Sequence, residues 1–235
     1  MTKHARVGLP RLLPASDAAL LVVLGDGPSE AATAAVLALL AELAARPPRG
    51  VLDLRPAYAS LLVVFDPRTT TLAELARAVE PLLPPPGPPL APAVRSVEVP
   101  VCYEGDCAPD LTDVARGAGL SPEEAAALHA SSSYRVAFLG FSPGFAYLLG
   151  LPPSLATPRL PAPRLAVPAG SVGIAGGQTG LYPRPTPGGW RLVGRTPLAL
   201  FSPSREPAAL LAPGDAVRFV AIPRRDFDLL RREDR

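Results

Sequence analysis

Hydrophobic positions in the first third of the chain change their spacing several times, which is typical of alternating strands and helices. Short apolar runs predict three strands, at 19–24, 51–54 and 61–65. Ala- and Leu-rich segments with helical spacing predict two helices, at 29–45 and 71–83. Pro47 and Pro48 end the first of these helices, because proline cannot continue the hydrogen-bond ladder.

Two further apolar stretches complete the pattern of this region. A strand near 7–13 and a strand at 94–101 would give the β-α-β-β-α-β order of a ferredoxin-like domain. The segment 84–93 is predicted to be a proline-rich linker, since it opens with Pro-Pro-Pro-Gly-Pro-Pro. We therefore expect a ferredoxin-like domain at 1–83, whose last strand at 94–101 follows the linker.

The pattern changes again in the remainder of the chain. A short helix is expected at 110–118, and a second opens with Ser121, which is followed by Pro122 and Glu124 in the positions of a capping box. From Tyr134 to a last strand at 216–222, short β-rich pieces alternate with Gly/Pro turns. This favours a closed or nearly closed β-barrel over 94–235, and an α+β fold class for the whole chain.

Composition excludes several classes of protein. The formal charge of +2 is small and the basic residues are scattered among acidic ones, so we expect no nucleic-acid partner. The apolar run Ala18–Leu24 is too short to span a bilayer, and the N-terminal residues do not resemble a signal peptide. We expect a cytoplasmic protein without membrane contact. In that compartment Cys102 and Cys107 are expected to be free thiols, because two cysteines do not complete a zinc site.

Candidate chemistry is concentrated in three segments. Seven of the thirteen aromatic residues lie between Tyr134 and Trp190, together with the only glutamine. The segments are 140–147 (GFSPGFAY), 168–182 (PAGSVGIAGGQTGLY) and 187–196 (PGGWRLVGRT). The glycines of the second segment have two interpretations. They could leave backbone N–H groups open to a ligand, or they could form tight turns and bulges at barrel corners.

These three segments resemble the signatures of the family of bacterial 5-oxoprolinase B subunits, which is also called allophanate hydrolase subunit 1 or KipI type. The similarity continues upstream through Val101-Cys-Tyr, Pro109-Asp-Leu and Leu128-His, and downstream through Leu200-Phe and Pro213-Gly-Asp. It is strong over 99–222 and covers the N-terminal domain only in its layout. One departure is the segment 104–107 (EGDC), where relatives commonly have Gly-Gly-Glu-Phe. The resemblance implies a small α+β domain followed by a cyclophilin-like β-barrel.

The resemblance also implies a function. It indicates the B subunit of an ATP-dependent enzyme that opens 5-oxoproline (pyroglutamate) to L-glutamate together with the A and C subunits. Mg-ATP would be bound in the assembled complex, and the B subunit would be inactive alone. Two alternatives stay open. KipI-type members inhibit a sensor histidine kinase, and the same barrel occurs in allophanate hydrolase and urea carboxylase assemblies, although this chain has no biotin carboxylase region.

The motifs that would indicate an enzyme active on its own, namely a nucleophile elbow, a Walker A loop or a metal site, are not satisfied in this sequence. The segment around Ser142 matches the Gly-x-Ser-x-Gly nucleophile elbow, but Pro143 lacks the N–H that the oxyanion hole needs. A Walker A loop needs a lysine beside its glycines, and Lys3 is the only lysine. We find no His, Cys and carboxylate spacing typical of a metal site, and expect none in this chain.

Two candidate catalytic residues remain. Arg195 could grip a carboxylate or phosphate with its planar guanidinium, or it could be a solvated residue at a strand end; with the resemblance we favour the site. His129 ends a helix, where the dipole would favour a protonated imidazole; we prefer a satisfied, capping histidine over acid–base catalysis. The remaining candidates would line a substrate or nucleotide pocket: Phe141, Pro143, Gly144, Phe145, Tyr147, Pro168, Gly170, Ser171, Gly173, Gln178, Thr179, Gly180, Tyr182, Gly188, Gly189, Trp190 and Thr196.

Overall fold

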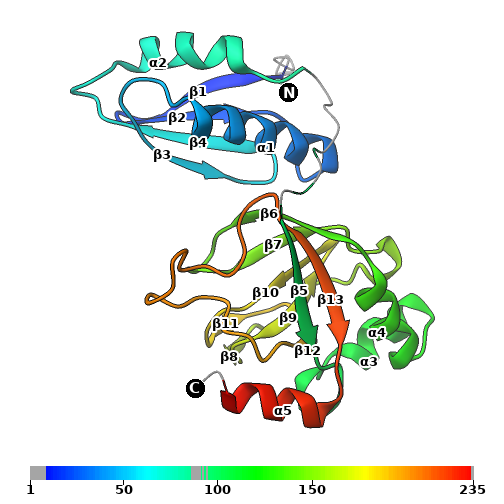
Figure 1. Ribbon diagram of the computed structural model, residues 1–235. Helices are drawn as coiled ribbons and strands as arrows, with labels where there is room; N and C mark the ends of the chain where they lie inside the picture. Colours follow the sequence, from blue (N-terminus) through cyan, green and yellow to red (C-terminus); the bar gives the residue numbers. More distant parts are fainter. Residues whose placement is uncertain (1–8, 86–90, 92, 94, 234–235) are drawn as a thin grey trace. The chain divides into compact units, whose positions relative to one another are not determined.

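The computed structural model describes residues 9–85, 91, 93 and 95–233, and the chain divides into two compact units, 1–92 and 93–235 (Figure 1). The first unit is a four-stranded antiparallel sheet whose strand order is β1-β2-β4-β3. Its elements are β1 (Arg11–Ser16), β2 (Ala19–Val23), α1 (Glu30–Ala45), β3 (Val51–Pro56), β4 (Ser60–Phe65) and α2 (Leu72–Val79), followed by a 3-10 turn at Glu80–Leu82. Alternation along β4 turns Leu61, Val63 and Phe65 toward the helices, where each is at most 1% exposed.

Side-chain caps define where both helices begin. The hydroxyl of Ser29 accepts the N–H of Ala32 at 3.1 Å, which satisfies one of the free donors at the start of α1. Thr71 and Glu74 form a reciprocal capping box at the start of α2. The helix predicted at 71–83 is shorter as an α-helix, because Pro81 lacks an N–H and the chain tightens into the 3-10 turn.

The strand predicted at 94–101 does not belong to the first unit. It is β5 (Ser96–Val101), which pairs in parallel with β13 (Ala216–Ala221) in the second unit. Val99 and Val101 are fully buried there in the barrel core, and this burial explains the pairing. In the first unit the place beside β2 is taken by β1. The predicted β-α-β-β-α-β order with a final strand after the linker is therefore corrected to β-β-α-β-β-α; residues 7 and 8 of the expected early strand lie outside the described residues.

The second unit is built on a seven-stranded sheet of order β12-β9-β10-β7-β6-β13-β5. Besides β5 and β13, its strands are β6 (Tyr134–Leu139), β7 (Ala146–Leu149), β9 (Ser171–Ala175), β10 (Gln178–Leu181) and β12 (Arg191–Arg195). A two-stranded ribbon is formed by β8 (Arg164–Val167) and β11 (Thr186–Gly188), and the helices are α3 (Leu111–Ala118), α4 (Pro122–Ser131) and α5 (Arg224–Glu233). The sequence pattern predicted α3, α4 and the β-rich character, but α5 was missed.

The two edge strands of this sheet meet, so the sheet is nearly closed. Cys102 follows β5 directly, and Arg195 is the last residue of β12. Their backbones exchange two hydrogen bonds, each 2.9 Å from N to O. The bridge pairs backbone groups that would otherwise remain open at two sheet edges, and it gives the barrel-like form visible in Figure 1.

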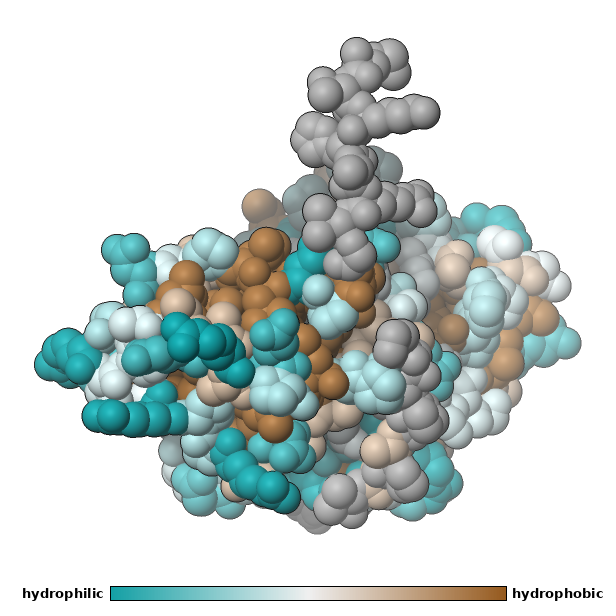
Figure 2. All heavy atoms as spheres, turned by 90° about the horizontal axis from the view of Figure 1, so that it is seen from above, coloured by the Kyte–Doolittle hydropathy of each residue, from teal (hydrophilic) through white to brown (hydrophobic). Residues whose placement is uncertain are grey.

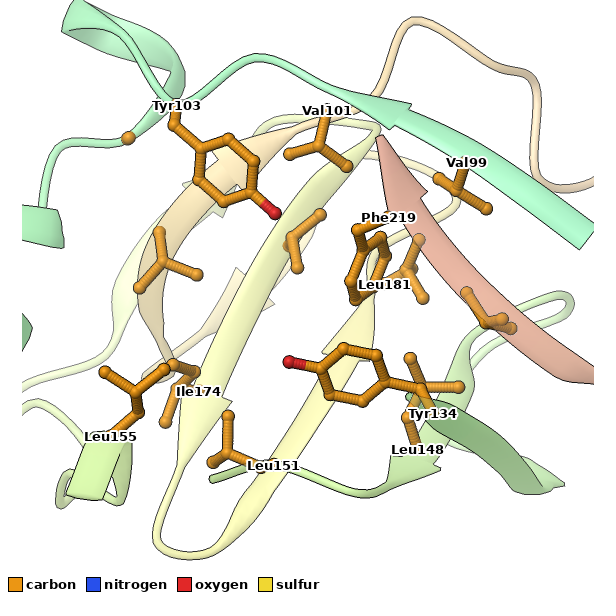
Figure 3. Packing of buried hydrophobic residues seen from close by; sticks show 14 of the residues in the cluster. Val99, Val101, Tyr103, Tyr134, Leu148, Leu151, Leu155, Ile174, Leu181 and Phe219 are labelled. Carbon is orange, nitrogen blue, oxygen red and sulfur yellow. The ribbon is translucent and has the colours of Figure 1, made fainter. Parts of the chain in front are cut away.

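The interior of the barrel is aliphatic with a few aromatic rings. Val99, Leu148, Ile174 and Leu181 are fully buried in it. Figure 3 shows these side chains converging from several strands, with Tyr103 directing its hydroxyl into the same space. Because successive side chains of a strand point to opposite faces, the same sheet presents a second set of side chains to its other face, despite register shifts in the β12–β9 and β6–β7 pairs.

A buried ion pair fastens the ribbon to the barrel. Arg164 on β8 donates to both oxygens of Asp110 at 2.7 and 2.8 Å, and to the carbonyl of Trp190 at 3.2 Å. Asp110 also accepts the N–H of Leu192 at 2.6 Å. Because the Asp110 carboxylate is only 8% exposed and its oxygens are well satisfied, removal of either partner would leave an uncompensated charge in the interior.

The surface is mixed. On the face seen in Figure 2, apolar atoms reach the surface in patches bordered by hydrophilic side chains. Among the described residues no helix combines the length and apolar character that a membrane span requires. The first unit contains a cavity of about 250 Å³ that none of the candidate site residues lines; its walls are Leu9, Pro10, Leu24, Gly25, Ser29, Ala31, Ala32, Ala35, Pro84 and Pro85.

Candidate functional site

Four of the predicted pocket residues form an aromatic cluster on the outer face of the barrel sheet. The ring of Phe145 lies edge-on to Tyr182 and to Trp190, with centroids 4.9 and 5.6 Å apart, and 4.8 Å from the ring of Tyr147. Phe145, Tyr182 and Trp190 are at most 5% exposed. Burial raises the pKa of Tyr182 to about 12, so its hydroxyl stays protonated at neutral pH. Arg159, which the sequence pattern did not single out, lies 6.0 Å from the centre of the Trp190 ring.

The glycines of the second segment make room for these rings. Gly173 and Gly180 are direct cross-strand partners on β9 and β10. A Cβ at Gly173 would come within 3.0 Å of Trp190, and one at Gly180 within 2.7 Å of the carbonyl oxygen of Ala146 and 3.0 Å of Phe145. Gly188 likewise lies against Tyr182. At these positions the structure supports the packing interpretation, because side chains of the protein itself occupy the space that the glycines leave.

The loop 140–145 places an aromatic ring at the surface in an unfavourable backbone conformation. Phe141 has φ +65° and is 63% exposed, although its ring edge contacts Phe145 and Tyr182. Gly144 adopts φ +82° and packs against Phe201. The hydroxyl oxygen of Ser142 is buried, with no hydrogen-bond partner among the described residues. A nucleophile elbow presents its serine oxygen openly, so this geometry does not fit a serine hydrolase at Ser142.

Arg195 lies at the bridge that closes the sheet, and its contacts are with residues outside the aromatic cluster of Phe145, Tyr147, Tyr182 and Trp190. Its Nε donates to the carbonyl of Ala169 at 2.8 Å, and its Cζ lies 5.7 Å from the centre of the Phe227 ring on α5. The side chain is half-buried, yet it forms no ion pair with a carboxylate in the described part of the chain. Burial and then the neighbouring Arg231 lower the pKa of Arg195. A bound anion would offset both effects, which is the property expected of an anion-binding residue.

His129 does not cap its helix as a cation. Its ring is 1% exposed and stacks on Phe219 with centroids 4.9 Å apart. Its Nδ1 lies 2.9 Å from the hydroxyl of Tyr103, and its Nε2 lies 3.4 Å from the hydroxyl of Thr179. Because Thr179 donates to the carbonyl of Gly173, its oxygen can accept Nε2–H while Tyr103 donates to Nδ1, and this arrangement suits a neutral ring.

Burial lowers the pKa of His129 to about 3, so the protonated form that the dipole would favour is not supported, whereas the expected satisfied histidine is found: both ring nitrogens have partners. The dipole at the end of α4 is outweighed by desolvation in the barrel core. His129 has no contact with the surface or with Arg195, and the acid–base role remains without support from its position.

The other predicted residues are distributed around the barrel. Three are almost completely buried, and each has a structural contact: Ser171, Thr179 and Thr196. Gly170 has φ +81° and exchanges backbone hydrogen bonds with Tyr182 and Thr196. Those with at least partial exposure are Pro143, Pro168, Gln178 and Gly189. Among the described residues no group of three or more His, Cys, Asp or Glu side chains could hold a metal ion.

Sequence reasoning missed α5 and the contacts that it makes with the site. The segment 224–233 repeats basic and acidic residues, and its apolar signal consists only of Phe227, Leu229 and Leu230. A helical spacing links Phe227 to Arg224 and Arg231, and Pro223 precedes the helix, so the start signal was present. The contact of Phe227 with Arg195 depends on tertiary structure and has no local signal.

The comparisons with known proteins agree with one another. A profile described as carboxyltransferase domain, subdomain C and D, matches residues 10–211. The chain is 41% identical over 227 residues to the 5-oxoprolinase B subunit of Bacillus subtilis (strain 168), covering 92% of this chain and 95% of that protein. A second relative, the 5-oxoprolinase B subunit of Escherichia coli O157:H7, is 57% identical over 131 residues, which are 56% of this chain and 60% of that protein.

Solved structures of larger proteins contain the same fold. TTHA0988 has 44% sequence identity and a TM-score of 0.75 over 87% of this chain. This chain spans only 39% of the TTHA0988 chain. Urea amidolyase of K. lactis has 19% identity and a TM-score of 0.75 over 95% of this chain, and this chain spans 15% of it. At that identity the likeness concerns the fold alone.

The packing role of the glycines predicts a stability difference between two of them. Gly180→Ala should lower the free energy of unfolding by about 1–3 kcal/mol, because the added methyl group meets a backbone carbonyl and Phe145. Gly177→Ala is the matched control: a Cβ there has no atom within 4 Å, and the change should stay within about 0.5 kcal/mol. Urea denaturation measures both. Equal stability of the two variants would show that the face at Gly180 is open, as a ligand site requires.

The neutral state of His129 predicts acid sensitivity in a defined range. A histidine with a folded pKa of about 3 and an ordinary unfolded value near 6.5 stabilises the fold above the unfolded pKa, and the contribution is lost as the pH falls toward 3. The unfolding free energy should therefore drop by about 2 kcal/mol between pH 7 and pH 5. His129→Gln should be less stable at pH 7 and should lack most of this drop. A His129→Gln variant with the same pH dependence as the unaltered chain would contradict the assignment.

Proposed function

The chain belongs to the family of the carboxyltransferase domain, subdomain C and D, and from this membership we propose that it is the B subunit of an ATP-dependent 5-oxoprolinase. The observation that carries the proposal is the 41% identity to the B. subtilis protein over 92% of this chain and 95% of that protein. The motif segments around Phe141, Gly173 and Trp190 support it. The A and C subunits would be the partners, 5-oxoproline the substrate and L-glutamate the product, in the cytoplasm.

The fold supports only in part the two more specific assignments, a cyclophilin-like barrel and a ferredoxin-like first unit. A cyclophilin-like barrel is consistent with the nearly closed seven-stranded sheet. In the first unit, the antiparallel order β1-β2-β4-β3 is consistent with a ferredoxin-like sheet in which β1 takes the place of the final strand. We keep both names as proposals about the fold.

Within the proposed reaction, Arg195 is the residue of this chain with the chemistry to hold an anion. ATP would activate the lactam carbonyl oxygen by phosphorylation before the ring is hydrolysed. Arg195 has a half-buried guanidinium that forms no ion pair among the described residues, although the Asp106 carboxylate lies within electrostatic range, so it could hold the carboxylate of 5-oxoproline or the phosphorylated oxygen. A bidentate pair of this kind would also orient the substrate.

We propose no nucleotide site at the packed glycines of the barrel sheet. The glycine faces at Gly173, Gly180 and Gly188 are filled by aromatic rings, so they do not offer their backbone to phosphates. The one lysine of the sequence, Lys3, lies outside the described residues. We therefore propose that Mg-ATP is bound in the assembled complex. The two other candidates, a kinase inhibitor and a urea-degrading assembly, gain no specific support from these contacts.

Assembly is the first consequence that can be measured. Coexpression with the cognate C subunit should give a complex that survives size-exclusion chromatography. The purified chain should show negligible glutamate formation from 5-oxoproline, and the A and C subunits with ATP and magnesium should restore it, because the proposed reaction is shared among the three subunits. Separate elution at micromolar concentration, or rapid turnover by the isolated chain, would contradict the proposal.

The second consequence concerns Arg195. In the assembled enzyme, Arg195→Ala should cost roughly 2–4 kcal/mol of transition-state stabilisation, a decrease of about thirtyfold to a thousandfold in kcat/KM. Arg195→Lys keeps the charge but loses the planar fork, and it should recover only part of the activity.

Controls separate this role from a structural one. Arg218→Ala is the matched variant, because Arg218 is exposed on β13 and pairs with Glu98 at the surface; it should leave turnover nearly unchanged. The melting temperature should be similar in all three variants. Near-normal turnover of Arg195→Ala would remove Arg195 from the site, and a collapsed melting temperature would make it a residue that only maintains the barrel closure.

A further inference from the structure

Two thiols lie together beneath the C-terminal helix, outside the chemistry proposed above. Cys102 and Cys107 are free, with exposures of 0% and 2%. They form a small buried cluster with Phe227, against which Ile222 packs. The neighbouring Cys102 thiol is one of the groups that raise the pKa of Cys107, in keeping with their place in one buried cluster. Two adjacent sulfur atoms in one chain are the reactants of an intramolecular disulfide.

The backbone holds the two cysteines differently. Cys102 is fixed by the two hydrogen bonds that it exchanges with Arg195 at the barrel closure. Cys107 ends the 3-10 turn Gly105–Cys107, in which Gly105 has φ +55° and Asp106 is exposed. Cys107 can therefore approach a fixed Cys102 through a change in a short surface turn, without disruption of the sheet.

The helix α5 covers the two thiols, and it is attached to the turn at 104–107 by one buried ring and by contacts at the surface. Phe227 is 1% exposed and lies in one buried cluster with both cysteines. Arg224 forms an ion pair with Asp106, and its backbone N–H donates to the Glu104 carboxylate at 3.3 Å. Surface pairs of this kind contribute little free energy each, so the N-terminal part of α5 can separate from the turn at a modest cost.

We propose that Cys102 and Cys107 are a redox-active dithiol that closes to a disulfide when α5 lifts, with a hydroperoxide as the oxidant. The sulfur of Cys107, on the exposed turn, attacks the O–O bond; the S–O bond forms, an alcohol or water leaves, and a sulfenic acid results. The sulfur of Cys102 then displaces the oxygen, which leaves as water. In total the two thiols lose two electrons and two protons, and the hydroperoxide is reduced.

Burial explains why the pair is unreactive while α5 is closed. Desolvation, followed by the neighbouring Cys102 thiol, raises the pKa of Cys107 to about 12, so the reactive thiolate is scarce at neutral pH. Lifting α5 removes the desolvation and leaves the positive charge of Arg195 nearby. A disulfide would also shift the turn that carries Asp106, the partner of Arg224, and so hold α5 away from the barrel.

Mass spectrometry of the full chain tests the chemistry directly. Both cysteines fall in the tryptic peptide 96–116, so an internal disulfide makes this peptide two hydrogens lighter and unreactive to N-ethylmaleimide. After hydrogen peroxide treatment of the native chain, we expect this species in monomeric protein. Persistent free thiols, disulfide-linked dimers or sulfinic acids as the main product would overturn the proposal.

Single substitutions test the order of the two steps. Cys102→Ser should accumulate a sulfenic acid at Cys107 that is trapped by dimedone, because the second thiol is absent. Cys107→Ser should leave Cys102 largely reduced, since that thiol is fixed and fully covered. Equal trapping in both variants would show that Cys107 is not the first site of attack.

Two alanine substitutions on α5 test the gate. Phe227→Ala removes the buried ring and should speed N-ethylmaleimide labelling of the native thiols by about tenfold or more. Leu229→Ala is the matched control on the same helix, because Leu229 is 58% exposed; its labelling rate should stay within about twofold of the unaltered chain. Equal rates in both variants would overturn the gate. If Phe227→Ala fails to fold by circular dichroism, the peroxide reaction of the unaltered chain still decides the proposal.

Discussion

The paired backbone hydrogen bonds between Cys102 and Arg195 are the constraint on which the second unit depends. They join the end of β5 to the end of β12, the two strands that would otherwise be open edges of the seven-stranded sheet. Because β5 also pairs with β13, this contact connects the start and the end of the unit's sequence. A closed sheet fixes the direction of each side chain, so the closure also fixes where Arg195 stands.

The closed sheet separates two kinds of packing. Alternation along β9 and β10 sends Ile174 and Leu181 to an aliphatic interior, while Gly173 and Gly180 face outward. The outer face is then filled by Phe145, Tyr182 and Trp190, which need the space that the glycines leave. The aromatic residues and the glycines of these motifs therefore pack together, because the rings occupy the space that the glycines leave. Their presence in the sequence does not by itself require a ligand.

Local signals predicted the elements, and long-range pairing decided their assignment. The helix α1 was predictable from Ser29 and the Ala/Leu spacing, and the capping box at Ser121 from four consecutive residues. The strand β5 was also predicted, but its apolar alternation is compatible with either unit, and only the partner β13 shows which core buries Val99. The same limit applies to His129: its position at a helix end is local information, whereas its burial among Tyr103, Phe219 and Thr179 is not.

The polar groups of the second unit fall into two kinds: those that stabilise the fold and those that could bind a ligand. Asp110, His129 and Thr179 are buried and have partners within the chain, so they contribute to a unique core and have little capacity left for a substrate. Arg195 differs, because one N–H bond to Ala169 uses only part of its donor capacity. A half-buried cation of this kind is costly unless anions lie near it, and among the described residues Asp106 is near Arg195 but forms no ion pair with it. An anion from outside the chain could complete the remaining donors of Arg195, and this is the physical argument behind the proposal that the protein is one part of a larger active site.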